Sequence, residues 1–172
     1  MRIRELRPSD IKPLASFLNS FHEEGKSDKD WGNPLFFERP TLKFRINRLK
    51  NEYKEVKNGN ELYYVATEGK EVIGSCAIKK MDIPDSELSH VGVLEIRVNS
   101  KWRDKGIGTK LLKYTINKAK SKFEVISASI LTINGASRHV FEKLGFKVWG
   151  TAPGYVKRGG RYIDIEFLSL RL

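Results

Sequence analysis

Residues 91–112 are the part of the chain best suited to chemistry. An apolar run, 91–98, leads into a polar turn and then into a helix start that carries Gly106 and Gly108. Glycine has no Cβ, so a ligand can approach the backbone closely at both positions. The first amides of a helix have no partner inside the helix, and the helix dipole favours an anion beside them. The spacing therefore predicts a diphosphate cradle made of backbone amides.

Positive charge is concentrated around the same glycines. Residues 97–122 contain nine lysines and arginines against one acid, Asp104, which is +8 of the chain's formal +11. Such an excess indicates an anionic partner: a phosphorylated cofactor, a nucleic acid or an acidic surface. The lysines from 113 to 122 are typical of a solvated helix face. Arg103 and Lys105, beside the glycines, are expected to face the anion.

Two common phosphate-binding loops do not match this pattern. A P-loop requires Gly-x-x-x-x-Gly-Lys-Ser/Thr, which residues 106–110 do not provide. A dinucleotide-binding loop requires a third glycine where Leu111 stands, after an opening β-α-β unit that does not precede the loop here. What remains is Arg-x-x-Gly-x-Gly, residues 103–108, after an apolar strand.

Residues 103–112 resemble motif A of the GNAT N-acyltransferases, which binds the pyrophosphate of acyl-coenzyme A. Residues 134–146 resemble motif B of the same family, and the resemblance extends through residues 160–164. It implies an α/β fold with a mixed central sheet of about six to seven strands and helices on both faces. It also implies acetyl-CoA as the cofactor and transfer of its acetyl group to a primary amine, which attacks the thioester directly.

The resemblance further implies roles for individual residues. The backbone of residues 96–98 is expected to pair with the pantetheine arm, and the amides of residues 104–109 to hold the diphosphate. Asn134 is expected to bond the pantetheine or the substrate, and it also suits a helix N-cap. A backbone amide near Val98 is expected to stabilise the carbonyl oxygen. The residues expected at the cofactor are Ile96, Arg97, Val98, Arg103, Asp104, Lys105, Gly106, Ile107, Gly108, Thr109, Asn134 and Phe141.

The general acid departs from the family's pattern. Many relatives carry a tyrosine in motif B that protonates the departing thiolate, but the matching residue here is Phe141. A phenyl ring cannot donate a proton. Either another group serves, with Tyr114, Tyr155 and Tyr162 as candidates, or the thiolate leaves unassisted.

The general base is equally open. In relatives, a glutamate that acts as the general base often stands at one of the positions that correspond to Gly92 and Ser129. Glu95 is the nearest acid on the strand and is the candidate base, with a salt bridge to Arg97 or a lysine as the alternative role. His90, at the start of the strand, is a second candidate.

The family places the acceptor amine near residues 23–40 and 153–161. Aromatic residues in the first segment can line that groove or anchor the loop in the core, and its acids would suit a cationic amine such as a protein lysine, a protein N-terminus, a polyamine or a small amine. These residues are Trp31, Phe36 and Phe37 for the aromatics, and Glu23, Glu24, Asp28 and Asp30 for the acids.

Periodicity and turn residues predict the elements that position these groups. The helices are expected at 11–22, 42–57, 107–122 and 136–144, and the strands at 2–7, 61–68, 71–80, 90–98, 125–133, 146–151 and 161–170, with a glycine-rich turn before the last strand.

Composition limits the class of protein. The 172 residues, 40% hydrophobic and 31% charged, suit a single globular domain over residues 1–172. One cysteine, Cys76, excludes a disulfide framework, and three scattered histidines predict no metal site. No apolar run is long enough for a bilayer and no secretory signal is evident, so we expect a cytoplasmic monomer or homodimer. The absence of Gln and the few Cys and Met favour a thermophilic source, which the abundant Asn opposes.

Two other functions fit parts of the sequence. A basic nucleic-acid-binding module would use the charge after Gly108, but these cations flank a glycine loop rather than alternating with exposed aromatics along a sheet. A GNAT relative that binds acyl-CoA without transferring the acyl group would explain Phe141.

Overall fold

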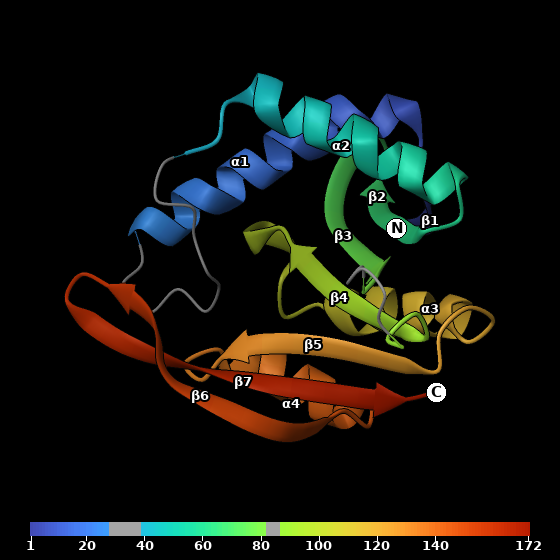
Figure 1. Ribbon diagram of the computed structural model, residues 1–172. Helices are drawn as coiled ribbons and strands as arrows, with labels where there is room; N and C mark the ends of the chain where they lie inside the picture. The colour runs from blue at the N-terminus through green and yellow to red at the C-terminus, as the bar shows by residue number, and fades with distance from the viewer. Residues whose placement is uncertain (28–38, 82–86) are drawn as a thin grey trace.

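The computed structural model describes residues 1–27, 39–81 and 87–172. Within them, seven strands form one mixed sheet in the order β1-β2-β3-β4-β5-β7-β6 (Figure 1). The β4–β5 pair is parallel and the other pairs are antiparallel. The elements are β1 (Arg2–Glu5), α1 (Ile11–Ser27), α2 (Leu42–Lys57), β2 (Glu61–Glu68), β3 (Glu71–Lys80), β4 (Val91–Val98), α3 (Ile107–Ala119), β5 (Val125–Leu131), α4 (Gly135–Lys143), β6 (Lys147–Arg158) and β7 (Arg161–Arg171), with 3-10 turns at Pro8–Asp10 and Ser100–Trp102.

Two hydrophobic cores hold the helices against opposite faces of the sheet, as expected from the sequence. On one face, α1 and α2 pack through residues such as Leu14, Leu18 and Leu49. On the other face, α3 and α4 pack through residues such as Leu111 and Phe141. The site described below therefore lies in a sheet that is covered on both sides.

The hairpin of β2 and β3 is confirmed with the predicted bounds, because the two apolar runs and the turn at Gly69 between them are local signals. Helix α1, in contrast, runs to Ser27 instead of ending near His22. Its last turn lacks apolar periodicity. The extension is held by tertiary contacts, because Glu24 accepts hydrogen bonds from Ser100 at 2.9 Å and from Arg103 at 2.6 Å.

Strand β6 is longer than predicted, since it reaches Arg158 instead of Thr151. Pro153 and Gly154 read as a turn in the sequence, but they form an irregularity inside the strand, where the register with β7 shifts between Ala152 and Val156. Gly154 has φ +60°, and its amide donates to Asp164 Oδ1 at 2.7 Å. The connection between β6 and β7 is consequently reduced to Gly159 and Gly160.

None of the helices in the described residues has the length and apolarity needed to cross a bilayer.

Candidate active site

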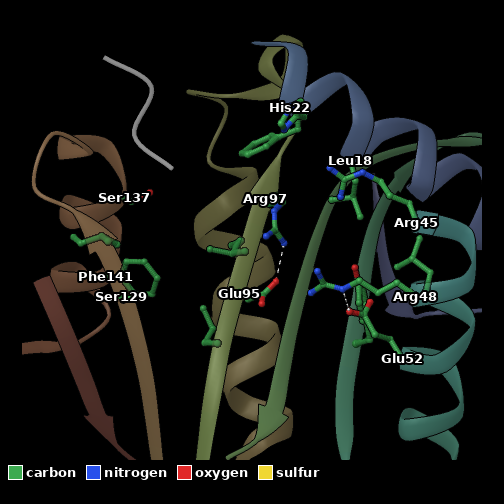
Figure 2. A pocket seen from close by; sticks show the side chains of 16 residues that line it. Leu18, His22, Arg45, Arg48, Glu52, Glu95, Arg97, Ser129, Ser137 and Phe141 are labelled. Atoms are coloured by element: carbon green, nitrogen blue, oxygen red, sulfur yellow. Dashed lines mark hydrogen bonds and ion pairs between the residues drawn. The ribbon is translucent and has the colours of Figure 1, made fainter. Parts of the chain in front are cut away.

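Strands β4 and β5 diverge in the middle of the sheet. They pair only where residues 91–93 lie beside residues 125–127. Further along, β4 stays beside β3 up to Val98, while β5 stays beside β7 up to Leu131. Figure 2 shows the two strands separating above this point. We call the space between residues 94–98 of β4 and 128–131 of β5 the splay.

Alternate residues of β4 turn their backbone groups into the splay. Met81 N–H donates to the carbonyl oxygen of Val91, and Asn99 N–H to that of Ile73, each at 2.9 Å. Bonds of an antiparallel ladder recur at every second residue, so the odd-numbered residues of β4 bond to β3. The residues whose backbone N–H and C=O point toward the splay are Leu94, Ile96 and Val98.

This alternation refines one expectation from the sequence. The backbone of residues 96–98 was expected to pair as a unit with an extended ligand arm, but the backbone of Arg97 faces β3. Of residues 96–98, Ile96 and Val98 present backbone groups to the splay, as Leu94 also does. Arg97 contributes its side chain instead, which lines both cavities described below.

The turn after β4 has the conformation of an anion-binding loop. Asp104 has φ +59° and Gly106 has φ +71°, and Gly106 is the N-cap of α3. Glycine adopts this left-handed region without strain, and aspartate is among the residues that tolerate it. The amides that open α3 have no partner inside the helix. The loop of residues 103–109 therefore presents hydrogen-bond donors to an anion.

Two cations of this loop bind the protein itself. Arg103 Nε donates to the Val98 carbonyl oxygen at 3.1 Å, and its Nη2 lies 2.6 Å from a Glu24 oxygen. Lys105 Nζ donates to the Lys101 carbonyl oxygen at 3.0 Å. Arg103 thereby ties the loop to both β4 and α1.

The first cavity, which we call the loop cavity, has a volume of about 500 Å³ and lies between this loop, the start of α3, α4 and the edge of β4. Except for Lys105, every residue expected at the cofactor lines it. These residues are Ile96, Arg97, Val98, Arg103, Asp104, Gly106, Ile107, Gly108, Thr109, Asn134 and Phe141.

The second cavity, which we call the helix cavity, has a volume of about 380 Å³ and lies between α1, α2 and the diverging strands. Its wall includes Leu18, Phe21 and Leu49, and its far side includes Ser129. The two cavities meet at the splay, because they share five lining residues: Phe21, Ile96, Arg97, Ser137 and Phe141.

Charged side chains gather in the helix cavity. Figure 2 shows Arg97 reaching from β4, and Arg45 and Arg48 reaching from α2, into the space between these elements. Glu95 Oε2 accepts a hydrogen bond from Arg97 Nη1 at 2.9 Å. Glu52 Oε1 accepts one from Arg48 Nε at 2.9 Å. Among the described residues that line the cavity, three arginines therefore stand against two glutamates.

Burial and neighbouring charges shift the pKa values of two of these groups. Burial alone would raise the pKa of Glu95, but the positive charges of Arg97, Lys79 and Arg48 outweigh it and lower that pKa. Burial lowers the pKa of Arg45 to about 10, helped by the positive charge of nearby arginines. Glu95 is therefore ionised at neutral pH, in a cavity with excess positive charge.

Asn134 and Phe141, the motif B residues expected at the cofactor, both line the loop cavity. Asn134 lines the loop cavity and caps α4, with its Oδ1 accepting from Ser137 N–H at 3.0 Å. Phe141 lies where the two cavities meet, and Figure 2 shows its ring directed from α4 toward the splay. It packs edge-to-face on Phe146, with 4.9 Å between ring centroids. An apolar ring thus occupies the position at which relatives carry a tyrosine.

Other candidates for proton transfer do not come together here. Tyr114 packs edge-to-face on Tyr64, Tyr155 and Tyr162 are about two-thirds exposed, and none of the three candidate tyrosines is among the described residues that line the two cavities. His90 Nδ1 lies 3.0 Å from the Glu87 carbonyl oxygen, in a turn away from both cavities.

The acidic groove expected between α1 and α2 is only partly described. Glu23 pairs with Arg39 at 3.3 Å and Glu24 pairs with Arg103. Neither glutamate lines a cavity in the described part of the chain. Asp28, Asp30, Trp31, Phe36 and Phe37 lie outside the described residues.

The polar residues of the helix cavity that were not singled out in the sequence include His22, Arg45, Arg48, Glu52 and Tyr63. His22 is buried and continues the stripe of Leu14 and Leu18 at a spacing of four, which was the available signal. Gly92, where relatives often carry a glutamate, has no room for a side chain. A Cβ there would lie 2.5 Å from Ile78 Cγ2.

Sequence comparison links this geometry to known proteins. Residues 22–146 match the profile of the Acetyltransferase (GNAT) family. The chain is 28% identical over 101 residues to the L-amino acid N-acetyltransferase AaaT of Escherichia coli (strain K12). It is 33% identical over 78 residues to the L-methionine sulfoximine/L-methionine sulfone acetyltransferase of Pseudomonas aeruginosa (strain PAO1). These matches cover 58% and 45% of this chain, and 61% and 45% of the relatives' own lengths.

Solved structures share the whole fold. A ribosomal-protein-alanine N-acetyltransferase from Brucella melitensis is 25% identical with a TM-score of 0.83, and the match covers 100% of both chains. The yncA protein from Salmonella typhimurium, solved with its cofactor acetyl-CoA, is 22% identical with a TM-score of 0.85, and the match covers 99% of this chain and 93% of that one.

Proposed function

Because the chain belongs to the acetyltransferase (GNAT) family, we propose that it transfers an acetyl group from acetyl-CoA to a primary amine. One observation carries the proposal. Strands β4 and β5 diverge, and the backbone groups that β4 turns into the splay lead directly to a loop whose conformation suits anion binding by its amides. An extended arm with a diphosphate at one end is the ligand that suits such a strand edge and loop.

The residues present fit acetyl-CoA. Ile96 and Val98 would pair with its pantetheine arm, as one more strand beside β4. The amides of residues 104–109 would hold the diphosphate, because the side chains of Arg103 and Lys105 are engaged by the protein. Asn134 lies on the opposite wall of the loop cavity, within the same groove.

Bound acetyl-CoA supplies an acyl thioester at the junction of the two cavities. The N–H of Ile96, a junction residue near Val98, points into the splay and would donate to the carbonyl oxygen as negative charge develops there, while Val98, which lines only the loop cavity, would pair with the arm. Glu95 holds the amine and receives its proton, as the new C–N bond forms and the C–S bond breaks. Phe141 encloses the junction without donating a proton, so the sulfur departs as a thiolate.

The cationic surroundings of Glu95 favour this chemistry. An amine must lose a proton before it can attack, and nearby positive charge disfavours its ammonium form. Arg45, Arg48 and Arg97 line the cavity in which the amine would stand. The same arginines lower the pKa of Glu95 and so make it a weaker base, but they also make the amine easier to deprotonate, which offsets that effect.

The acceptor is a free amine that fits the helix cavity. Two relatives are named for acceptors that are amino acids or close analogues of them, which supports an amino-acid α-amine. A protein lysine, a protein N-terminus and a polyamine are the competing acceptors. They are favoured by the acidic residues in the segment 23–40 of the sequence.

Acetyl transfer can be tested on the purified chain with acetyl-CoA and a panel of free amino acids, polyamines and peptides. Release of coenzyme A thiol and the mass of the product report turnover. We expect release that depends on an amine, with an N-acetylated product. Saturable acetyl-CoA binding without product from any amine would instead favour an acyl-CoA-binding protein. Salt-dependent DNA binding unaffected by coenzyme A would favour a nucleic-acid-binding module.

A further inference from the structure

We propose that the helix cavity binds the head group of a free α-amino acid, with Arg97 and Arg45 on its carboxylate and Glu95 on its ammonium group. This inference rests on the proposed acetyl transfer, and it defines the acceptor and the groups that select it. It is carried by the charges, contacts and burial of side chains from three elements, α1, α2 and β4.

The ion pair on β4 is complementary to a zwitterion. Glu95 and Arg97 are two residues apart on one strand, so both side chains lie on the face covered by α1 and α2. Their charged atoms are 2.9 Å apart. An α-amino acid carries its ammonium and carboxylate on one carbon, at a similar separation. Each end of the head group can therefore meet the opposite charge of the pair.

Arg45 adds a second cation in a fixed position. Its Nε donates to Asn19 Oδ1, and both residues are buried, at 8% and 5% exposure. This bond between α2 and α1 restrains the guanidinium at the cavity wall. Arg97 is close enough to repel it electrostatically. Two like charges are costly to hold together where one of them is buried, and a carboxylate between them reduces that cost.

The position of the cavity matches the reaction. The helix cavity meets the loop cavity at Ile96, Arg97 and Phe141, beside the backbone edge that would hold the thioester. Glu95 directly precedes the junction residue Ile96 on β4, so an ammonium group on Glu95 lies beside the junction, while Arg45 on α2 draws the carboxylate away from it. Leu18, Phe21 and Leu49 provide an apolar wall for the amino-acid side chain.

The same features select against the other acceptors. A polyamine has no carboxylate, so binding it would add positive charge beside the arginines. A peptide has its α-carboxyl group in an amide bond, which carries no negative charge. A cavity of about 380 Å³ is in the range of small-molecule sites.

The experiment compares an apolar amino acid, methionine, with methioninamide, which differs only in the carboxylate. We expect kcat/KM for methionine to exceed that for methioninamide by about 10- to 100-fold, the worth of one or two charge-assisted hydrogen bonds. Arg45→Met and Arg97→Met should each reduce this ratio by about tenfold or more. Lys50→Met, which removes an exposed cation from the same helix, should leave the ratio unchanged.

Binding is measured in parallel by calorimetry, with methionine titrated into the protein saturated with coenzyme A, so that no turnover is needed. Variants are first checked by their acetyl-CoA-induced rise in Tm. Arg97→Met, at a side chain that is about one-third exposed, guards against a failure of Arg45→Met to fold. Equal kcat/KM for methionine and methioninamide in the parent would overturn the zwitterion site while leaving acetyl transfer intact. Methionine binding without any turnover would support the site and contradict the proposed function.

Discussion

Replacing Gly108 separates the stability of helix α3 from acetyl-CoA binding. Gly108 is the second residue of α3 and lines the loop cavity. An alanine Cβ at this position would lie 3.6 Å from Val98 Cγ2, which is an ordinary van der Waals contact. The fold thus accepts a side chain here, whereas a diphosphate that needs close approach to the amide does not.

The two effects have opposite signs. Glycine inside a helix is less favourable than alanine by about 0.5–1 kcal/mol. Gly108→Ala should therefore raise Tm by about 1–4 °C in a chain of this size. Gly108→Val gains less, because β-branched residues are poorer helix formers. Loss of a single amide–phosphate hydrogen bond should raise Kd for acetyl-CoA by about 10- to 100-fold, more in the valine variant than in the alanine variant.

Calorimetric titration with acetyl-CoA and thermal melts of the unliganded protein measure the two quantities. Gly150→Ala is the matched control, since Gly150 lies on β6, where a Cβ would meet nothing within 4 Å. It should bind acetyl-CoA like the parent. A stable Gly108→Val protein with the parent's affinity would refute the assignment of the diphosphate to this loop.

Three further substitutions test the site and its surroundings. Phe141→Tyr restores a hydroxyl at the junction of the cavities, and kcat should rise several-fold; a stable variant with unchanged kcat would mean that the thiolate leaves without an acid here. Glu95→Gln should lower kcat/KM by about 100-fold or more, and unchanged steady-state kinetics would remove Glu95 from the mechanism. Glu61→Gln should stabilise the fold by about 1–3 kcal/mol at pH 8.5 and have little effect at pH 5, as measured by urea denaturation; the same gain at both pH values would contradict the cause proposed.

The sign of the Glu61 prediction follows from its pKa. Glu61 is buried at 3% exposure, and burial raises its pKa to about 8, against the lowering effect of Lys79. The unfolded chain releases this proton at the ordinary pKa of 4.5. Between pH 4.5 and 8 the folded state holds a proton that the unfolded state has lost, so stability falls as pH rises through this window. Glutamine keeps the shape of the protonated acid and abolishes that loss.

Local signals in the sequence were sufficient for most of the fold. The strand-to-helix unit around Gly106 and Gly108 was predicted because the apolar strand, the polar turn and the helix stripe are all contiguous. The end of β6 was not predicted, because the irregularity in this strand depends on a hydrogen bond from the Gly154 amide to Asp164, which is ten residues away in the partner strand. A glycine next to a proline reads as a turn until that partner is known.

The residues of the candidate site likewise fall into two groups: those predictable from local sequence and those that depend on tertiary packing. Residues of the loop cavity lie mostly in two short motifs, which the sequence displays directly. Arg45 and Arg48 lie on a helix rich in charged residues and were indistinguishable from its solvated face. Only the packing of α2 over β4, and the bond from Arg45 to Asn19, reveals that these arginines face a cavity.

The most direct test of the account is a titration of the isotope-labelled protein with acetyl-CoA, followed through the NMR signals of its backbone amides. We expect the largest shift changes at Ile96 and Val98, along the open edge of β4, and at residues 104–109, with saturation at a single affinity. Saturable binding that leaves these amides unchanged, or no binding at millimolar acetyl-CoA, would contradict it.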